Sequence, residues 1–355
     1  MSYADKDFDW PKGEVQRAAS APRRWGIALA IGICAVTIGI GQQGHATDSM
    51  PGPRISLQHV LMQLADQVRP ATLGLTITDL QSGRTWRINA SRPFPMMSVF
   101  KAPLGAAVLS KVDRGILFLG QRVIIKRQDL RTWGVSQITA TFHGDQEAFT
   151  VRQLLEAAVS HSDNTAADVL LKLVGGPVVV TAFLRSHGVR GMRVDRGERD
   201  IAQEFQEEGV AQGVGSEETP TQKDARLRRG YAAYLNDPRD RTTPDAAARF
   251  LEELWQGQLL SPTSTRLLLS LLYNQTVPSR LRAGVPANVR LADKCGTSYT
   301  VDGMTAAFND IGILSWPDGH TVIVAAFLTA SHAPRNRMNA SFKDIAQAVI
   351  TGLHP

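Results

Sequence analysis

Apolar residues recur at three- and four-residue steps in several stretches of the chain, which predicts amphipathic helices. These stretches are residues 57–68, 98–112, 149–160, 164–173, 178–185, 244–255, 261–272 and 341–353. Alternating apolar positions predict strands at 73–80, 84–88, 123–127, 289–292, 304–316 and 321–329. Because most strands lie near the two ends and helices fill the middle, we expect an α+β fold. It would hold a five-stranded antiparallel sheet flanked by helices as three α/β/α layers, plus an inserted all-α domain.

The expected domain boundaries follow from this order of elements. Residues 47–97 and 289–355 would form the sheet domain, and residues 98–288 the helical domain. Residues 195–243 show no sustained apolar period and predict a long irregular segment, in which 221–235 is a basic amphipathic helix. A loop of this length inside a domain is usually functional or partly disordered.

The first 46 residues predict an export signal. An apolar run at residues 25–41 follows an Arg-Arg pair, and it is shorter than the roughly 20 residues of a membrane-spanning helix. The Gly-His-Ala triplet at 44–46 has the small-x-small pattern of a cleavage site. The arginine pair is compatible with the twin-arginine route. We expect a periplasmic or secreted protein without membrane contact after cleavage, with an uncleaved anchor as the alternative.

Composition excludes several other classes of protein. Net charge is +6, but lysines and arginines are scattered and form no basic stripe with aromatics, which argues against nucleic-acid binding. The eight histidines form no His-x-His or His-x-x-x-His pair, so we expect no metal and no other cofactor. Cys34 lies in the leader and leaves Cys295 alone, so the mature chain has no intramolecular disulfide. We expect a monomer that binds a small-molecule substrate.

A candidate nucleophile stands where an extended segment turns into a helix. Pro93 and Pro95 cannot continue a helix, and the helical pattern begins at Ser98. Free N–H groups and the helix dipole favour an alkoxide at such a first turn. Lys101, three residues later, is an amine that can take the hydroxyl proton. A capping serine and a solvated lysine are the ordinary alternative.

Three further motifs stand at element boundaries. They are Ser-Asp-Asn at 162–164, Asp-Arg-Gly-Glu at 195–198, and Lys-Cys-Gly-Thr at 294–297. Each has an ordinary explanation when taken alone: a helix cap, a solvated loop and an edge-strand lysine. Their joint occurrence, in this order and at this spacing, is improbable by chance.

With these motifs the chain resembles a class A serine β-lactamase over essentially the whole mature sequence. Ser-x-x-Lys, Ser-Asp-Asn and Lys-Thr-Gly are the signature set of those enzymes and of penicillin-binding proteins. The resemblance implies an antiparallel sheet with flanking helices plus an all-helical domain. That fold agrees with the order of elements described above.

The resemblance implies roles for four catalytic residues. Ser98 would be the acylated nucleophile, and Lys101 a base or proton relay. Ser162 would pass a proton to the leaving lactam nitrogen. Glu198, at the usual separation from Ser-Asp-Asn, would activate the water that hydrolyses the acyl-enzyme.

The resemblance also implies a set of substrate-binding residues. Asn164 would bind the substrate amide and orient the lysine of the first motif. Lys294 and the Thr297 hydroxyl would bind the substrate carboxylate, beside Gly296 of the same motif. Backbone N–H groups of Ser98 and Thr297 would form the oxyanion hole.

Four more positions match the family less specifically. Trp133 resembles an aromatic gate over the substrate, with a core aromatic as the alternative. Arg280 matches an arginine that some branches use for the carboxylate, with a surface arginine as the alternative. Arg196 and Asp240 match the salt bridge that closes the neck of the family's Ω-loop.

The sequence departs from the family pattern in three places. Cys295 replaces the usual threonine or serine, and a thiol is a weak hydrogen-bonding group. Ala202 stands where many members have an asparagine that helps to hold the deacylating water. The segment between Glu198 and Asp240 is longer than usual and would form a flap on the rim of the site.

The expected activity is hydrolysis of the β-lactam amide of penicillins or cephalosporins through a serine acyl-enzyme, which gives antibiotic resistance. A penicillin-binding D,D-peptidase and a penicillin receptor without turnover are the alternatives. Glu198 argues against the peptidase, because peptidases lack it. Cys295, Ala202 and the unusual leader favour the receptor.

Overall fold

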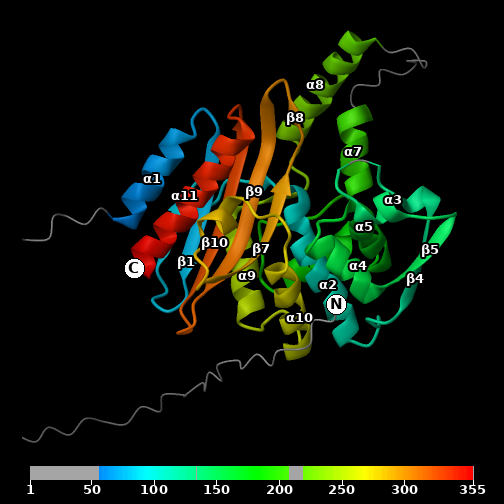
Figure 1. Ribbon diagram of the computed structural model, residues 1–355, viewed down its shortest axis with the longest axis horizontal. Helices are drawn as coiled ribbons and strands as arrows, with labels where there is room; N and C mark the ends of the chain where they lie inside the picture. The colour runs from blue at the N-terminus through cyan, green and yellow to red at the C-terminus, as the bar shows by residue number, and fades with distance from the viewer. Residues whose placement is uncertain (1–55, 133, 208–218, 355) are drawn as a thin grey trace, which may run out of the picture. The chain divides into compact units, whose positions relative to one another are not determined.

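An antiparallel sheet forms the centre of the protein, as the computed structural model of residues 56–132, 134–207 and 219–354 shows (Figure 1). Its strand order is β2-β1-β10-β9-β7, and a short strand, β8, also pairs with β9. The strands are β1 (Thr72–Asp79), β2 (Thr85–Ile88), β7 (Arg290–Thr297), β8 (Thr300–Val301), β9 (Met304–Ser315) and β10 (Thr321–Ser331). The predicted five-stranded antiparallel sheet is therefore confirmed.

Helices cover both faces of this sheet, because its central strands are apolar on both sides. Almost every residue of β9 and β10 is buried. One face packs against α1 (Leu57–Gln67) and α11 (Arg335–Leu353), which contribute to a shared apolar core. The other face lies against α9 (Pro244–Trp255) and α10 (Pro262–Tyr273). The result is the predicted arrangement of three layers (Figure 1).

A group of helices beside the sheet surrounds one buried helix, α2. Nine successive residues of α2 are buried from its first residue, Lys101, onward. The other elements of this group are α3 (Gln137–Thr141), α4 (Val151–Val159), α5 (Asn164–Leu173), α6 (Pro177–Ser186) and the hairpin of β4 (Arg122–Lys126) and β5 (Gln146–Thr150). Within the described residues no single helix is long and apolar enough to span a membrane, although the bent pair of α5 and α6 meets both criteria together.

Residues 195–243 contain two helices, which corrects the expected irregular segment. They are α7 (Glu198–Glu207) and α8 (Pro220–Asn236), and α8 matches the helix predicted at 221–235. The sequence pattern missed α7 because Ile201 and Phe205 are its only buried apolar side chains among those described.

Other elements begin or end at different residues from those expected. β7 continues through polar residues to Thr297, and α11 begins at Arg335. A two-residue pair, β3 (Phe94–Pro95) with β6 (Arg241–Thr242), joins the segment before Ser98 to the segment after Asp240. The predicted export signal and Trp133 lie outside the described residues.

The packing of α11 predicts a large effect of truncating Phe342. This side chain is fully buried, and its ring meets Phe308 edge-on with centroids 5.3 Å apart. Phe342→Ala should lower the free energy of unfolding by about 3–5 kcal/mol, through lost burial and a cavity. Phe118→Ala is the matched control because Phe118 is 64% exposed, and it should change stability by less than about 0.5 kcal/mol. Urea unfolding measures both, and equal effects would contradict the packing described here.

Candidate active site

The turn that carries Ser98 lies directly against strand β7. Residues Met97–Phe100 form a 3₁₀ turn that leads into α2, so the predicted helical start is confirmed with a tighter first turn. At Gly296 a Cβ atom would approach the Val99 and Ser98 nitrogens to 3.0 and 3.1 Å and would overlap the Met96 carbonyl oxygen. Only glycine therefore lets β7 come this close to the candidate nucleophile.

A buried asparagine from β9 also holds the turn in place. Asn309 Nδ2 donates to the carbonyl oxygens of Pro95 at 2.7 Å and Met96 at 3.1 Å. Met97 has a positive φ of 47°, so the chain turns sharply just before Ser98. Reasoning from sequence gave Asn309 no role; its signal was a polar residue within an apolar strand.

Lys101 lies at the centre of the site and is fully buried. Its Nζ donates to Ser98 Oγ at 3.0 Å, to the Ser162 carbonyl oxygen at 2.8 Å and to Asn164 Oδ1 at 2.6 Å. Its Nζ also lies 2.9 Å from Glu198 Oε1. One ammonium group thus connects the four segments that carry the predicted catalytic residues.

Ser162 lies between two buried lysines. Lys294 Nζ donates to Ser162 Oγ at 3.0 Å, and Lys101 Nζ lies 3.5 Å from the same oxygen. Burial lowers the pKa of Lys294 to about 8, and the nearby Lys101 charge acts in the same direction. Ser162 has a φ of +58°, and the next residue, Asp163, caps α5 by accepting from Ala166 N at 2.9 Å. This local turn directs Ser162 and the first residue of α5 into the site.

Glu198 is buried beside the nucleophile at the start of α7. Its Oε1 accepts from Ser98 Oγ at 3.3 Å. Its backbone N–H donates to Asp168 Oδ1 of α5 at 2.6 Å, and Arg131 pairs with the other oxygen of that carboxylate. Asp168 is a second supporting residue that sequence reasoning missed.

A buried ion-pair network joins the two ends of the segment that carries Glu198, at the neck of the predicted Ω-loop. Arg196 Nε lies 2.6 Å from Asp240 Oδ2, so the predicted pairing of these residues is present. Arg196 also pairs with Asp237 at 2.9 Å and with Glu204 of α7. Burial raises the pKa of Asp240, against the lowering effect of Arg196 and of two backbone N–H groups.

Arg280 is 3% exposed and lies in the wall of the site, so it is no surface arginine. Its Nη1 donates to the Asn309 carbonyl at 2.5 Å and to the Gly296 carbonyl at 3.2 Å, and its Nη2 donates to Thr297 Oγ1. The guanidinium carbon lies 4.1 Å from the centroid of the Phe308 ring. These contacts tie the arginine to the end of β7.

These residues surround one cavity of about 370 Å³. The predicted site residues that line it are Ser98, Ser162, Asn164, Glu198, Arg280, Gly296 and Thr297. The two lysines lie behind this lining in contact with Ser162. Cys295 and Ala202, the two unusual residues, also line the cavity.

The arrangement suits acyl transfer. A hydroxyl that has a lysine amine and a carboxylate within hydrogen-bond distance can lose its proton as it attacks a carbonyl carbon. The charge of Arg280, which contacts Thr297, and the charge of Lys294, which contacts Ser162, suit an anionic substrate group. Among the described residues no cluster of histidine, cysteine, aspartate or glutamate could hold a metal ion.

Comparison with known proteins supports the same conclusion. A sequence model described as the Beta-lactamase enzyme family matches residues 56–353. The extended-spectrum β-lactamase PER-1 of Pseudomonas aeruginosa is 33% identical over 282 residues, which is 79% of this chain and 82% of that one. A β-lactamase of Streptomyces albus G is 33% identical over 293 residues, covering 82% and 81%.

Solved structures agree with these relatives. An ancestral class A β-lactamase from the lineage of Gram-negative bacteria superposes with a TM-score of 0.69 at 33% identity, covering 84% of this chain and 100% of the other. A β-lactamase from Chitinophaga pinensis gives a TM-score of 0.70 at 28% identity, covering 82% and 97%. The shared fold, sequence and site geometry lead to one conclusion: the chain belongs to the class A serine β-lactamase family.

Proposed function

We propose that this chain hydrolyses the amide bond of β-lactam antibiotics through a Ser98 acyl-enzyme that a Glu198-activated water releases, and so confers resistance. One observation carries the assignment of roles. The Ser98 hydroxyl lies 3.0 Å from Lys101 Nζ and 3.3 Å from Glu198 Oε1. The same carboxylate can therefore accept a proton from the nucleophile and, later, from the water that attacks the ester.

In the acylation step, Ser98 Oγ attacks the lactam carbonyl carbon as its proton passes to Lys101. Lys101 acts as base in its neutral form, or as a relay that gives one of its own protons to Glu198, 2.9 Å away. The negative oxygen of the tetrahedral intermediate would accept from the backbone N–H groups of Ser98 and Thr297. The C–N bond then breaks, and Ser162 gives its proton to the leaving nitrogen. Contacts of 3.0 Å with Lys294 and 3.5 Å with Lys101 support this proton transfer.

In the deacylation step, Glu198 takes a proton from water, and the oxygen attacks the acyl carbon. The ester bond to Ser98 Oγ breaks, and the serine recovers its proton. Burial of Glu198 next to the Lys101 ammonium supports this role, because the ion pair fixes the carboxylate in the direction of the ester. Ala202 offers no side-chain hydrogen bond to the water, so positioning would depend on Glu198 and its neighbours.

Substrate binding would depend on charge at one end of the cavity and on an amide at the other. Lys294, Arg280 and the Thr297 hydroxyl would bind the carboxylate, while Asn164 would bind the side-chain amide. Cys295 leaves this carboxylate site with a weaker hydrogen-bonding group than a hydroxyl. The charged neighbours carry most of the attraction.

Export to the periplasm is part of the proposal. The apolar run at 25–41 and the Gly-His-Ala triplet at 44–46 support a cleaved signal, and the arginine pair before them supports the twin-arginine route. After cleavage the protein would act as a monomer. This location would place it where β-lactams reach the cell wall.

The roles of Ser98 and Glu198 predict different covalent behaviour in two variants. Glu198→Gln should still be acylated by a penicillin but lose at least about 100-fold in deacylation, because the amide is no base. Its adduct should accumulate and appear in intact-protein mass spectrometry. Ser98→Ala should show no adduct at all. Asp200→Asn removes an exposed carboxylate from the same helical turn, and it should turn over substrate like the parent.

Two results would contradict these assignments. Normal turnover by Glu198→Gln would remove the carboxylate from deacylation. A persistent adduct on Ser98→Ala would place the nucleophile elsewhere.

The lowered pKa of Lys294 predicts that kcat/KM declines on the alkaline side of its pH profile. The ammonium is charged below its pKa of about 8 and becomes neutral above it. Attraction for the substrate carboxylate is therefore present at low pH and is lost as pH rises through about 8. We expect kcat/KM for a penicillin to fall as pH rises through about 8 and to level off at the lower value that Arg280 and Thr297 alone sustain.

The matched control for this profile is Lys294→Arg, whose guanidinium stays charged over the whole range. In that variant the limb near pH 8 should disappear even if overall activity is lower. Steady-state kinetics between pH 6 and 10 measures both proteins. The same limb in both would show that another group titrates.

A further inference from the structure

Helix α8, in the lengthened segment after Glu198, carries two buried tyrosines on one face. Tyr231 and Tyr234 are three residues apart in the helix, and each is 1% exposed. They belong to a small apolar core that is distinct from the core under α11. Its buried members come from the nucleophile turn, α7, α8 and β9: Met97, Ile201, Phe205, Tyr231, Tyr234, Ala306 and Ala307. The two tyrosines therefore meet the turn, the helix that begins at Glu198 and the sheet at one place.

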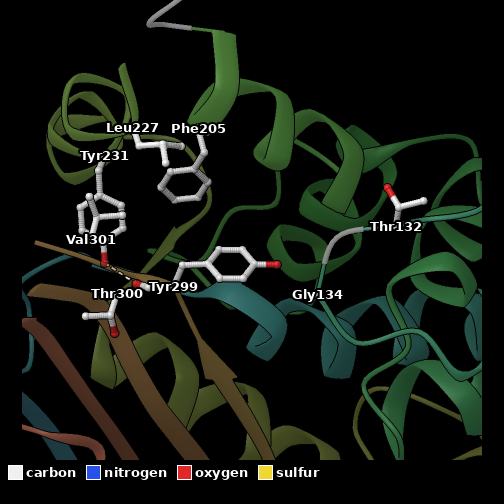
Figure 2. A pocket seen from close by; sticks show the side chains of 8 residues that line it. All are labelled: Thr132, Gly134, Phe205, Leu227, Tyr231, Tyr299, Thr300 and Val301. Carbon is white, nitrogen blue, oxygen red and sulfur yellow. Dashed lines mark hydrogen bonds between the residues drawn. The ribbon is translucent and has the colours of Figure 1, made fainter. Parts of the chain in front are cut away.

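The Tyr231 hydroxyl is bonded to the chain immediately after Thr297. It donates to the Tyr299 carbonyl at 2.6 Å and lies 3.0 Å from Ser298 Oγ. Figure 2 shows this side chain pointing from α8 toward Tyr299, with the hydrogen bond as a dashed line. The hydroxyl also accepts a hydrogen bond from Ala306 N of β9. Because Ser298 directly follows Thr297, these bonds hold the end of β7 in place.

Tyr234 holds the residue that precedes the nucleophile. Its hydroxyl donates to the sulfur of Met97 at 2.9 Å, and its ring packs on Phe205 with centroids 4.6 Å apart. A thioether sulfur is a weak acceptor, so this hydrogen bond adds little to stability. Its effect is on position: the bond determines where the Met97 side chain lies relative to α8.

The backbone of Met97 depends on such support. Its φ of 47° is in the left-handed region, which costs free energy for a residue other than glycine and persists only where neighbouring contacts impose it. Gly296 and Asn309 contact the backbone just before this residue. Tyr234 holds its side chain. The direction of the Ser98 N–H therefore depends on contacts with both the sheet and α8.

The two tyrosines thus reach the neighbours of both N–H groups proposed for the oxyanion hole. One N–H belongs to Ser98, which follows Met97, and the other belongs to Thr297, which precedes Ser298. These segments are far apart in the sequence, and the two donors must point at one place to stabilise a developing oxyanion. A single helix that contacts both neighbours fixes the position of one donor relative to the other.

Helix α8 is itself held firmly enough to give this support. Asp237 caps its end and pairs with Arg196 at 2.9 Å. Arg241 Nη2 donates to the Tyr234 carbonyl at 2.5 Å. Burial raises the pKa of the Tyr231 and Tyr234 hydroxyls, so both stay protonated donors well into alkaline pH.

We propose that Tyr231 and Tyr234 are positioning residues that hold the two backbone N–H groups of the oxyanion hole at the separation and direction required by the tetrahedral intermediate. Tyr231 acts through Ser298 on one donor, and Tyr234 acts through Met97 on the other. This inference rests on the proposed function. It gives the lengthened segment a part in the rate of the chemical steps, although neither tyrosine touches the substrate.

The first test removes one hydroxyl at a time and keeps the ring. Tyr231→Phe and Tyr234→Phe should each lower kcat for a penicillin at least about tenfold, since a misplacement of about 1 Å can cost on the order of 100-fold. KM should stay within about twofold, because acylation and deacylation form an oxyanion at the same point and slow together. Tyr273→Phe is the matched control and should change neither value, because its hydroxyl lies 3.2 Å from Ser315 Oγ, at the end of β9 remote from the site.

The second test reads the oxyanion hole directly, in acyl-enzymes that accumulate when Glu198→Gln is present. Hydrogen bonds from the hole weaken the ester C=O bond and lower its stretching frequency, which infrared difference spectroscopy measures with a penicillin labelled with ¹³C at the lactam carbonyl. Adding Tyr231→Phe or Tyr234→Phe should move this band to higher frequency. Adding Tyr273→Phe should leave the band in place. A role in stability alone would lower the thermal unfolding temperature without moving the band.

Either an unchanged kcat or an unchanged carbonyl band in Tyr234→Phe would overturn the positioning role while leaving the proposed function intact. That variant decides the question if Tyr231→Phe does not fold, as judged by thermal unfolding, because it removes only a hydroxyl bonded to a weak acceptor. A Glu198→Gln protein that forms no acyl-enzyme with the penicillin would overturn the proposed function itself.

Discussion

The positive charge of Lys101, buried without any exposure, is the constraint that organises this site. A buried ammonium is strongly unfavourable unless hydrogen bonds and an opposite charge compensate for its lost hydration. Here the compensation comes from Ser98, Ser162, Asn164 and Glu198, which belong to segments far apart in the sequence. Satisfying one charge therefore brings to the same point the residues proposed as nucleophile (Ser98), proton donor (Ser162), amide-binding group (Asn164) and base (Glu198).

Buried ion pairs also hold in place the lengthened segment between Glu198 and Asp240. Arg196 contacts Asp240 at one side of the neck and Asp237, which caps the end of α8, at the other. Asp237 N donates to the Tyr234 carbonyl, so the helix end and the neck are one unit. The ion pairs of Arg196, two residues before Glu198, thus also hold the end of α8.

Much of the fold was predictable because its signals are local. Alternating apolar residues predicted the strands of the sheet, and helical spacing of apolar residues predicted α5, α8 and α9. The prolines before Ser98 predicted where α2 begins. Relations between distant residues were not predictable: the close approach of Gly296 to Ser98, the support from Asn309 and Asp168, and the burial of Arg280. No local pattern distinguishes an arginine inside a site from an arginine on the surface, because the difference lies in the strands that pack around it.

The pairing of strands in the central sheet determines when the sheet can form during synthesis of the chain. Strand β1 pairs along its whole length with β10, so that Thr72 lies opposite Thr329. Until β10 has been synthesised, β1 lacks this partner and one of its two edges stays open, an arrangement prone to aggregation. The catalytic turn meets its supports on β7 and β9 equally late. The site therefore cannot assemble until β7, β9 and β10 have all been synthesised.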